Sequence, residues 1–232
     1  MREDTTGGRV LLASLHQAIA EVLPARLELY ERWLTPGGAG EDPIAAAPFT
    51  AMLASLQQEG DALDAVAAGA GRHAAVRSFR RLPLLRRAGL RALPQRIRAG
   101  KIVRLAAEML PELYPDSRVD MTRRGGTLFI NIDGSPFCAA RRTDDQPSCG
   151  FYVSVLTTFL QLFHIRAAVK VSRCRASGSK SCLLMVLTAP SRAAADSPVS
   201  GLEHGNAPSG IAAPGPEVPA APPTPALRRQ HR

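Results

Sequence analysis

The chain has 232 residues, 45% of them hydrophobic, and a formal net charge of +9, so it is long enough for one core of ordinary size and does not require two. The acidic opening has no apolar stretch before Val10, and the apolar run from Phe151 to Phe163 is too short for a bilayer, so we expect neither a secretory signal nor a transmembrane segment. These features favour a cytoplasmic protein whose cysteines serve as thiols or metal ligands rather than as a disulfide framework.

Helical spacing of apolar residues runs through the first half of the chain. It is interrupted at Pro24, Pro83 and Pro94, and a stretch rich in glycine and proline follows Leu34. The helical half is expected to end near Pro115. We predict helices over five segments: 11–23, 27–34, 49–57, 61–79 and 94–113.

The apolar period becomes alternating in the second half, which predicts strands. A first hairpin is expected over 119–132 around a Gly125-Gly126 turn, and a second over 167–187. Between them, Asp145 or Ser148 can cap a helix that is apolar on a broad face. The predicted fold class is α+β, with N-terminal helices packed on an antiparallel sheet made of two β-hairpins separated by a buried helix.

The register of the second hairpin follows from the position of its turn. A turn centred on Gly178 places Cys174 opposite Cys182, because side chains alternate between the faces of a strand. That register puts the two thiols off the core face. The core face is then expected to carry Val169, Val171, Leu183, Met185 and Leu187.

Composition divides the chain into three parts. Residues 1–71 form an N-terminal helical region that shares one core with an α/β domain over 72–189. From Pro190 to Arg232 the chain has no Phe, Trp or Tyr and holds nine of the nineteen prolines. Such a segment cannot offset its ordering entropy by burial, so we expect 190–232 to be a disordered tail.

Three cysteines are expected to meet at one point. Cys149 lies at the start of the predicted buried helix, where the helix dipole favours a thiolate, and Cys174 and Cys182 flank the second turn. Three convergent thiolates would supply most of a tetrahedral zinc shell. The alternative is that they are small buried apolar residues, since free cysteine is often inert in a core.

A run of positive charge without any carboxylate extends from Ala65 to Arg104. Such a face attracts anions, which include nucleic-acid phosphates, acidic lipid headgroups, a ligand carboxylate or an acidic partner protein. The alternative is an ordinary solvated surface. Phe79 is the one aromatic residue in the run, which disfavours nucleic acid because base stacking needs aromatics. The candidate anion-binding residues are Arg77, Arg80, Arg81, Arg86 and Arg87.

The run from Gly126 to Phe137, the helix after Cys149 and the hairpin from Val169 to Cys182 resemble the 4-vinyl reductase domain family. The resemblance covers roughly 72–187 and is most specific in Ser135-Pro136-Phe137 and in the C-x-A-x-G-x-x-x-C hairpin. Members share an α/β fold with TRAPP-type trafficking subunits and haem-NO-binding domains. They include bacteriochlorophyll-biosynthesis accessory proteins and phenol-sensing modules that hold a small hydrophobic molecule beside a zinc site.

The resemblance also implies a set of metal ligands. In phenol-sensing members, zinc is bound by a cysteine before the helix, a glutamate three residues ahead of the hairpin cysteine and the two hairpin cysteines. By resemblance the cysteines are Cys149, Cys174 and Cys182, but Val171 stands where the glutamate is expected. Cys138 and His164 are the candidates for the fourth donor.

We therefore expect a binding module that holds a hydrophobic or aromatic molecule, with zinc as a structural metal, and that acts through an unidentified protein partner. A second copy of the chain, in a homodimer, is a further candidate partner. The alternatives are an accessory or reductase component of tetrapyrrole biosynthesis and binding of nucleic acid or an anionic partner through the arginines. No G-x-G-x-x-G motif follows a strand, so the sequence supplies no nicotinamide or flavin site for vinyl reduction and we assign no catalytic residue. The candidate ligand-binding residues, each also explicable as core, are Trp33, Phe49, Phe129, Phe137 and Phe159.

Overall fold

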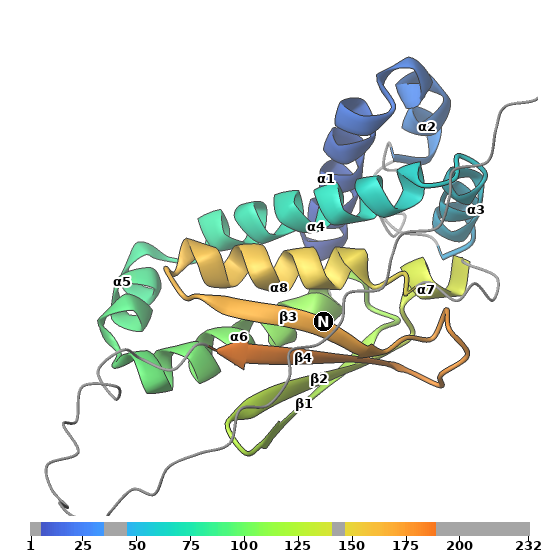
Figure 1. Cartoon of the computed structure of the whole chain (residues 1–232). Helices are drawn as coiled ribbons and strands as arrows, with labels where there is room; N and C mark the ends of the chain where they lie inside the picture. The colour runs from blue at the N-terminus through green and yellow to red at the C-terminus, as the bar shows by residue number, and fades with distance from the viewer. Residues whose placement is uncertain (1–5, 35–45, 141–146, 189–232) are drawn as a thin grey trace, which may run out of the picture. The chain divides into compact units, whose positions relative to one another are not determined.

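Two β-hairpins form one antiparallel sheet, and helices cover one of its faces (Figure 1). The computed structural model describes residues 6–34, 46–140 and 147–188. The helices are α1 (Thr6–Val22), α2 (Leu27–Leu34), α3 (Ala46–Gln57), α4 (Ala62–Arg81), α5 (Leu84–Ala92), α6 (Gln95–Leu113), α7 (Pro136–Ala140) and α8 (Gly150–Leu162), with a 3-10 turn over Pro24–Arg26. The strands are β1 (Arg118–Arg124), β2 (Thr127–Asp133), β3 (Ala167–Arg173) and β4 (Cys182–Thr188).

The sheet has the strand order β1-β2-β4-β3 and every neighbouring pair is antiparallel. Each hairpin therefore supplies one central and one edge strand, and the hairpins join where β2 pairs with β4. Helix α8 lies between the hairpins in sequence and has six buried residues. The predicted α+β class, with two hairpins separated by a buried helix, is confirmed.

The register of the second hairpin differs from the sequence prediction by one residue. Val171 pairs with Leu184, and a bulge between Val171 and Arg173 restores the spacing nearer the turn. Because side chains alternate along a strand, a one-residue slip exchanges the two faces. The predicted core assignment of Leu183, Met185 and Leu187 is therefore wrong. The buried side chains of β4 are Cys182, Leu184 and Val186.

Helices α6 and α8 contact the sheet, and α4 packs along α8 and also contacts α1. In Figure 1, α4 and α8 run side by side for most of their length. Gly71 of α4 faces the backbone of Phe151 and the side chain of Ser154, so that a Cβ at this position would clash with both. This close approach fixes the first turn of α8 against the middle of α4, and α4 continues through residue 71, where the sequence-based division was drawn.

The five predicted helical segments all lie in helices, since they correspond to α1 to α4 and α6. Helices α5 and α7 were not predicted. Ser148 does not cap α8, because Cys149 is the N-cap residue. Asp145 and the predicted tail over 190–232 lie outside the described residues, so those expectations stay predictions.

No single helix in the described part of the chain is long and apolar enough to cross a membrane. Gly7–Val22 and Pro24–Glu31 pass the test of length and hydropathy only as a pair, and they are bent by 118° at the break between them.

Candidate metal centre

Cys138 is positioned by the short helix α7. Ser135 precedes the helix, and its Oγ accepts a hydrogen bond at 3.3 Å from the backbone N–H of Cys138. Pro136 stands at the first helical position, where a missing N–H costs nothing. A serine cap followed by proline is a recognised helix start, so this sequence signal could have predicted α7.

Cys149 is positioned by the start of α8. It is the N-cap residue, with φ −87° and ψ 14°, and its carbonyl accepts a hydrogen bond from the N–H of Val153 at 3.1 Å. Its side chain makes no capping hydrogen bond, so the sulfur is turned toward the other cysteines instead.

Cys174 and Cys182 flank the turn between β3 and β4. The carbonyl of Cys174 accepts hydrogen bonds from the N–H groups of Ser177 and Ser179, both at 3.2 Å. Gly178 has φ +85°, a conformation that other residues rarely adopt. The turn thus closes tightly enough that the N–H of Arg175 donates to Sγ of Cys182 at 3.4 Å.

A polar contact fastens this turn to the central strand of the sheet. Ser181 donates its hydroxyl hydrogen to Oδ1 of Asn131 on β2 at 2.7 Å. The next residue, Cys182, pairs in register with Ile132. These two contacts attach the turn that carries Cys174 and Cys182 to β2, a central strand of the sheet.

The four cysteine sulfurs form one buried cluster, all within 4.8 Å of one another. The Sγ–Sγ distances are 3.6 Å for Cys138–Cys149, 3.6 Å for Cys138–Cys174, 3.2 Å for Cys149–Cys174 and 3.4 Å for Cys138–Cys182. A tetrahedral zinc site with Zn–S bonds of about 2.3 Å has sulfurs about 3.8 Å apart. A disulfide needs about 2.05 Å, so these four thiols have the spacing of a metal site.

The shared environment of the sulfurs perturbs their pKa values in opposite directions. The pKa of Cys149 is raised, first by its hydrogen bond with Cys138, then by those with Cys174 and Cys182 and by burial. The pKa of Cys174 is lowered, first by its hydrogen bond with Cys138 and then by those with Cys149 and Cys182. Four buried thiols this close cannot all ionise alone, whereas a divalent cation would neutralise the thiolates and take the place of the shared protons.

Of the two candidates for the fourth ligand, Cys138 lies in the cluster with the other three cysteines and His164 does not. His164 is exposed and follows the far end of α8, about 20 Å of helix from Cys149. Val171 lies on β3 beyond the bulge and has no donor atom. The four cysteines could therefore hold a metal ion without a carboxylate.

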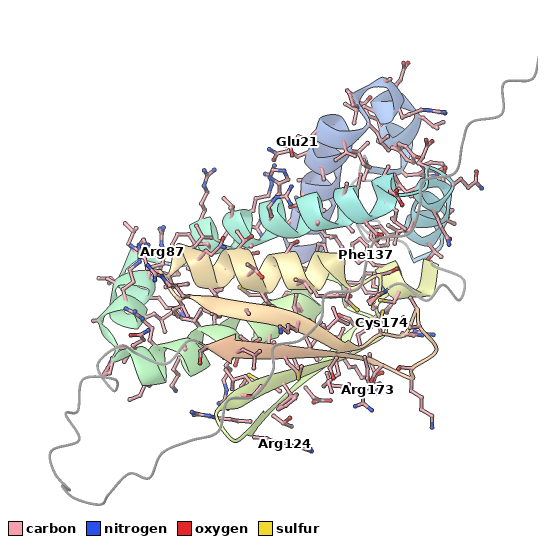
Figure 2. The ribbon with its side chains drawn as sticks, in the orientation of Figure 1. Glu21, Arg87, Arg124, Phe137, Arg173 and Cys174 are labelled. Carbon is pink, nitrogen blue, oxygen red and sulfur yellow. The ribbon has the colours of Figure 1, made fainter. Side chains whose placement is uncertain are left out.

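Three aromatic rings pack on one another next to Cys138. Phe137, adjacent to Cys138, stacks on Phe151 with ring centroids 4.5 Å apart, and Tyr152 meets both rings edge-on. The phenol of Tyr152 is fully buried, which raises its pKa, while its hydrogen bond to Ser135 acts in the opposite direction. Figure 2 shows Phe137 above the sulfurs at the end of the sheet where Cys174 lies.

The five candidate ligand-binding residues do not share one location. Phe49 and Phe137 meet edge-on at 6.4 Å. Phe159 contacts Phe79 and Phe163, about 12 Å further along α8 than Phe151. Trp33 packs on Tyr30 of α2. Phe129 is half-buried and pairs with Met185, on the opposite face of the sheet from Cys182.

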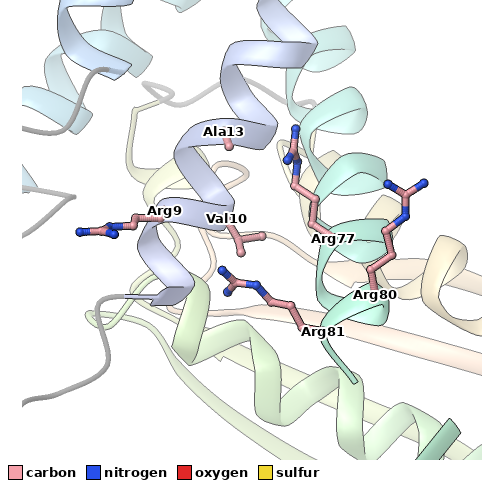
Figure 3. Close-up of a pocket in the computed structure, with 6 residues that line it drawn as sticks. All are labelled: Arg9, Val10, Ala13, Arg77, Arg80 and Arg81. Atoms are coloured by element: carbon pink, nitrogen blue, oxygen red, sulfur yellow. The ribbon is translucent and has the colours of Figure 1, made fainter. Parts of the chain in front are cut away.

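The predicted arginine face falls into two groups. Arg77, Arg80 and Arg81 line a pocket between α1 and α4 together with Arg9 (Figure 3). Arg87 lies over the ring of Phe79 at 5.0 Å, and Arg86 is exposed on α5. Arg9 was not predicted, because it lies far from the charged run in the sequence.

Similarity to known structures supplies independent information on the fold. An H-NOX protein from K. algicida, in the Fe(II) unliganded state, aligns over 79% of this chain and 97% of its own, with 11% identity and a TM-score of 0.52. An H-NOX protein from S. oneidensis in the Fe(II)NO state aligns over 78% and 99%, with 9% identity and a TM-score of 0.50. The chain has the H-NOX fold.

The sequence itself gives no further match. A scan against models of known protein families found none, and neither did a search of curated proteins. The resemblance to the 4-vinyl reductase family thus rests on the sequence motifs alone. The expected similarity of this chain to haem-NO-binding domains is confirmed for the fold.

The described histidines do not fit a haem, the group that haem-NO-binding relatives imply. Haem iron takes an axial histidine, cysteine, methionine or tyrosine. His16 and His164 lie at the surface, and His73 pairs with Glu21 at 3.0 Å. The described cysteines are engaged with one another. The described histidines and cysteines therefore do not supply the axial ligand, and we derive no function from haem.

Proposed function

We propose that the chain is a small-molecule-binding sensor or carrier domain of the H-NOX fold with a structural zinc ion held by Cys138, Cys149, Cys174 and Cys182. The observation that carries the metal is the spacing of the four sulfurs, which is close to that of a tetrahedral thiolate shell. Zinc would supply charge neutralisation and cross-linking at this site and no redox chemistry.

The position of the cluster supports a structural role. It joins α7, the start of α8 and the β3–β4 turn, which are three segments far apart in the sequence. All four sulfurs are buried, and a closed four-sulfur shell leaves no open position for a substrate. The metal would thus hold the hairpin against the helical layer.

The ligand of the proposed sensor is a small molecule with an apolar part. A pocket of about 850 Å³ lies along α1, α2 and α4, and its lining combines Leu12, Ala13, Ala20 and Leu34 with the polar residues Arg9, His16, Gln17, Glu31 and Arg77. This volume is within the range of small-molecule sites. Because the interior aromatic residues pack on one another, this pocket is the better candidate. The signal would pass to a protein partner.

The metal is tested on the full chain by elemental analysis and by counting reactive thiols before and after chelation. We expect one zinc per chain, four protected thiols and loss of zinc in Cys174→Ser, with Ser177→Ala in the same turn as the matched control. Cobalt substitution of the wild-type chain gives a second readout, because tetrahedral thiolate coordination has a characteristic visible absorption. Metal-free protein whose four thiols react at once, and which takes up neither ion, would contradict the proposal.

The ligand is tested by native mass spectrometry of protein purified from its own host. A retained apolar small molecule would support the sensor or carrier function. A retained tetrapyrrole would instead support the alternative, an accessory role in tetrapyrrole biosynthesis, which rests only on the motif resemblance.

A further inference from the structure

Four arginines surround a pocket of about 310 Å³ between α1 and α4. Arg9 comes from α1, and Arg77, Arg80 and Arg81 come from the last two turns of α4; Val10 and Ala13 complete the described lining. Figure 3 shows Arg77 and Arg81 extending between the two helices, while Arg9 points away from α4. The described lining contains no carboxylate.

Arg77 is only partly satisfied by the protein. Its Nη2 donates to Oε1 of Gln17 at 3.1 Å. Its Nε is buried and has no hydrogen-bond partner among the described residues. A buried donor on a charged group costs free energy unless it is paired, so an anion that reached this guanidinium would offset that cost. Guanidinium groups match the planar or tetrahedral oxygens of carboxylates and phosphates.

Two carboxylates of α1 and α2, Glu21 and Glu31, each lie beside a histidine. Glu21 pairs with His73 at 3.0 Å, and this hydrogen bond lowers the pKa of Glu21. Glu31 lies 3.5 Å from His16 and lines the larger pocket of about 850 Å³. An anion would therefore be repelled at the end near Glu31 and attracted at the arginine end.

The two pockets adjoin, because Arg9, Ala13 and Arg77 line both. The combined site has a cationic end, and the rest of the larger pocket is lined by Leu12, Ala20 and Leu34 together with His16, Gln17 and Glu31. We infer that the site between α1 and α4 binds a small molecule whose acidic group, a carboxylate or a phosphate, lies among the arginines and whose apolar part lies in the larger pocket. This inference extends the proposed function by naming the chemistry of the ligand, and it does not involve the cysteine cluster.

The experiment measures binding of inorganic phosphate, acetate and octanoate to the full chain by calorimetry and by chemical-shift changes in 15N-labelled protein at low ionic strength. We expect phosphate and acetate to bind, with shifts confined to residues of α1 and α4. Arg77→Lys keeps the charge but loses the guanidinium fork, and Arg81→Ala removes one charge; each should weaken binding about tenfold or more. Arg86→Ala removes the same charge from exposed α5 and should change the affinity less than about twofold.

Octanoate separates the two proposals. If octanoate binds at least about tenfold more tightly than acetate, and Ala20→Phe removes that advantage while phosphate binding is kept, both the acidic-group site and the apolar pocket are supported. If phosphate and acetate bind at the arginines but octanoate gains nothing, the anion site stands and the apolar pocket fails. Equal weakening by Arg81→Ala and Arg86→Ala, or absence of any binding, would overturn the inference.

Discussion

Replacing Gly71 by alanine tests how α8, and with it Cys149, is positioned. A Cβ at Gly71 would lie against the carbonyl oxygen of Phe151, 2.9 Å from Cβ of Ser154 and 3.1 Å from the carbonyl carbon of Phe151. Ordinary contact begins at 3.4 Å, so the side chain of Ser154 alone requires about 0.5 Å more room and the backbone oxygen requires more. Since the opposing atoms are largely backbone, α8 must move as a whole.

Gly100 of α6 is a matched control, because a Cβ there has no atom within 4 Å. Alanine is favoured over glycine in a helix by about 1 kcal/mol, and this gain applies to both substitutions and cancels in their difference. Overpacking costs about 1–3 kcal/mol, and contact with rigid backbone places Gly71→Ala at the upper end. We expect the two variants to differ by about 3 kcal/mol in unfolding free energy, or roughly 6–12 °C in Tm.

The assay is thermal and urea unfolding of wild type, Gly71→Ala and Gly100→Ala. Gly100→Ala should be slightly more stable than wild type, and Gly71→Ala should be less stable. Because displacement of α8 moves Cys149, Gly71→Ala should also lower zinc affinity about tenfold or more in competition with a chelator. Equal melting temperatures for the two variants would refute the close packing of α4 on α8.

Three other predictions concern separate parts of the molecule. Phe79→Ala removes a ring that contacts Phe159, Phe163 and Arg87, and should cost about 3 kcal/mol in chemical unfolding, whereas a loss below about 1 kcal/mol would mean that these contacts do not stabilise the fold. Burial raises the pKa of Tyr152, so ionisation of its phenol should not affect stability below pH 10, the ordinary pKa of tyrosine being about 10. Stability should fall as the pH rises above that value, because the unfolded chain loses the proton more easily than the folded protein. If ultraviolet titration of folded protein showed all three tyrosines ionising near about pH 10, the raised pKa of Tyr152 would be contradicted. Deletion of 190–232 should leave Tm unchanged, because this segment has no aromatic residue to bury, and a large drop in Tm would show that it packs on the domain.

Local sequence signals were sufficient for most of the fold. Alternating residues over 119–132 and 167–187 and the apolar helix between them gave the two hairpins and α8, because each signal depends only on periodicity. The bulge between Val171 and Arg173 could not be read in the same way, since an extra residue leaves the alternation unchanged on either side of it. That single residue determined which face of β4 is buried.

The candidate site was predicted in part. Convergence of Cys149, Cys174 and Cys182 followed from a helix start and a turn, which are local features. The arrival of Cys138 depends on α7 and on how it packs against Phe151, and packing between distant segments has no periodic signal. The same limitation applies to Arg9, whose place beside Arg77 depends on the crossing of α1 and α4.

The order of the strands has a consequence for how copies of the chain can meet. The outer strands β1 and β3 carry Arg118, Arg123 and Arg124 on one side of the sheet, and Lys170 and Arg173 on the other. If two sheets met edge to edge, the backbone groups of their outer strands could form hydrogen bonds. The same approach would bring the positive side chains of these strands close together. This like-charge repulsion is a known safeguard against edge-to-edge aggregation.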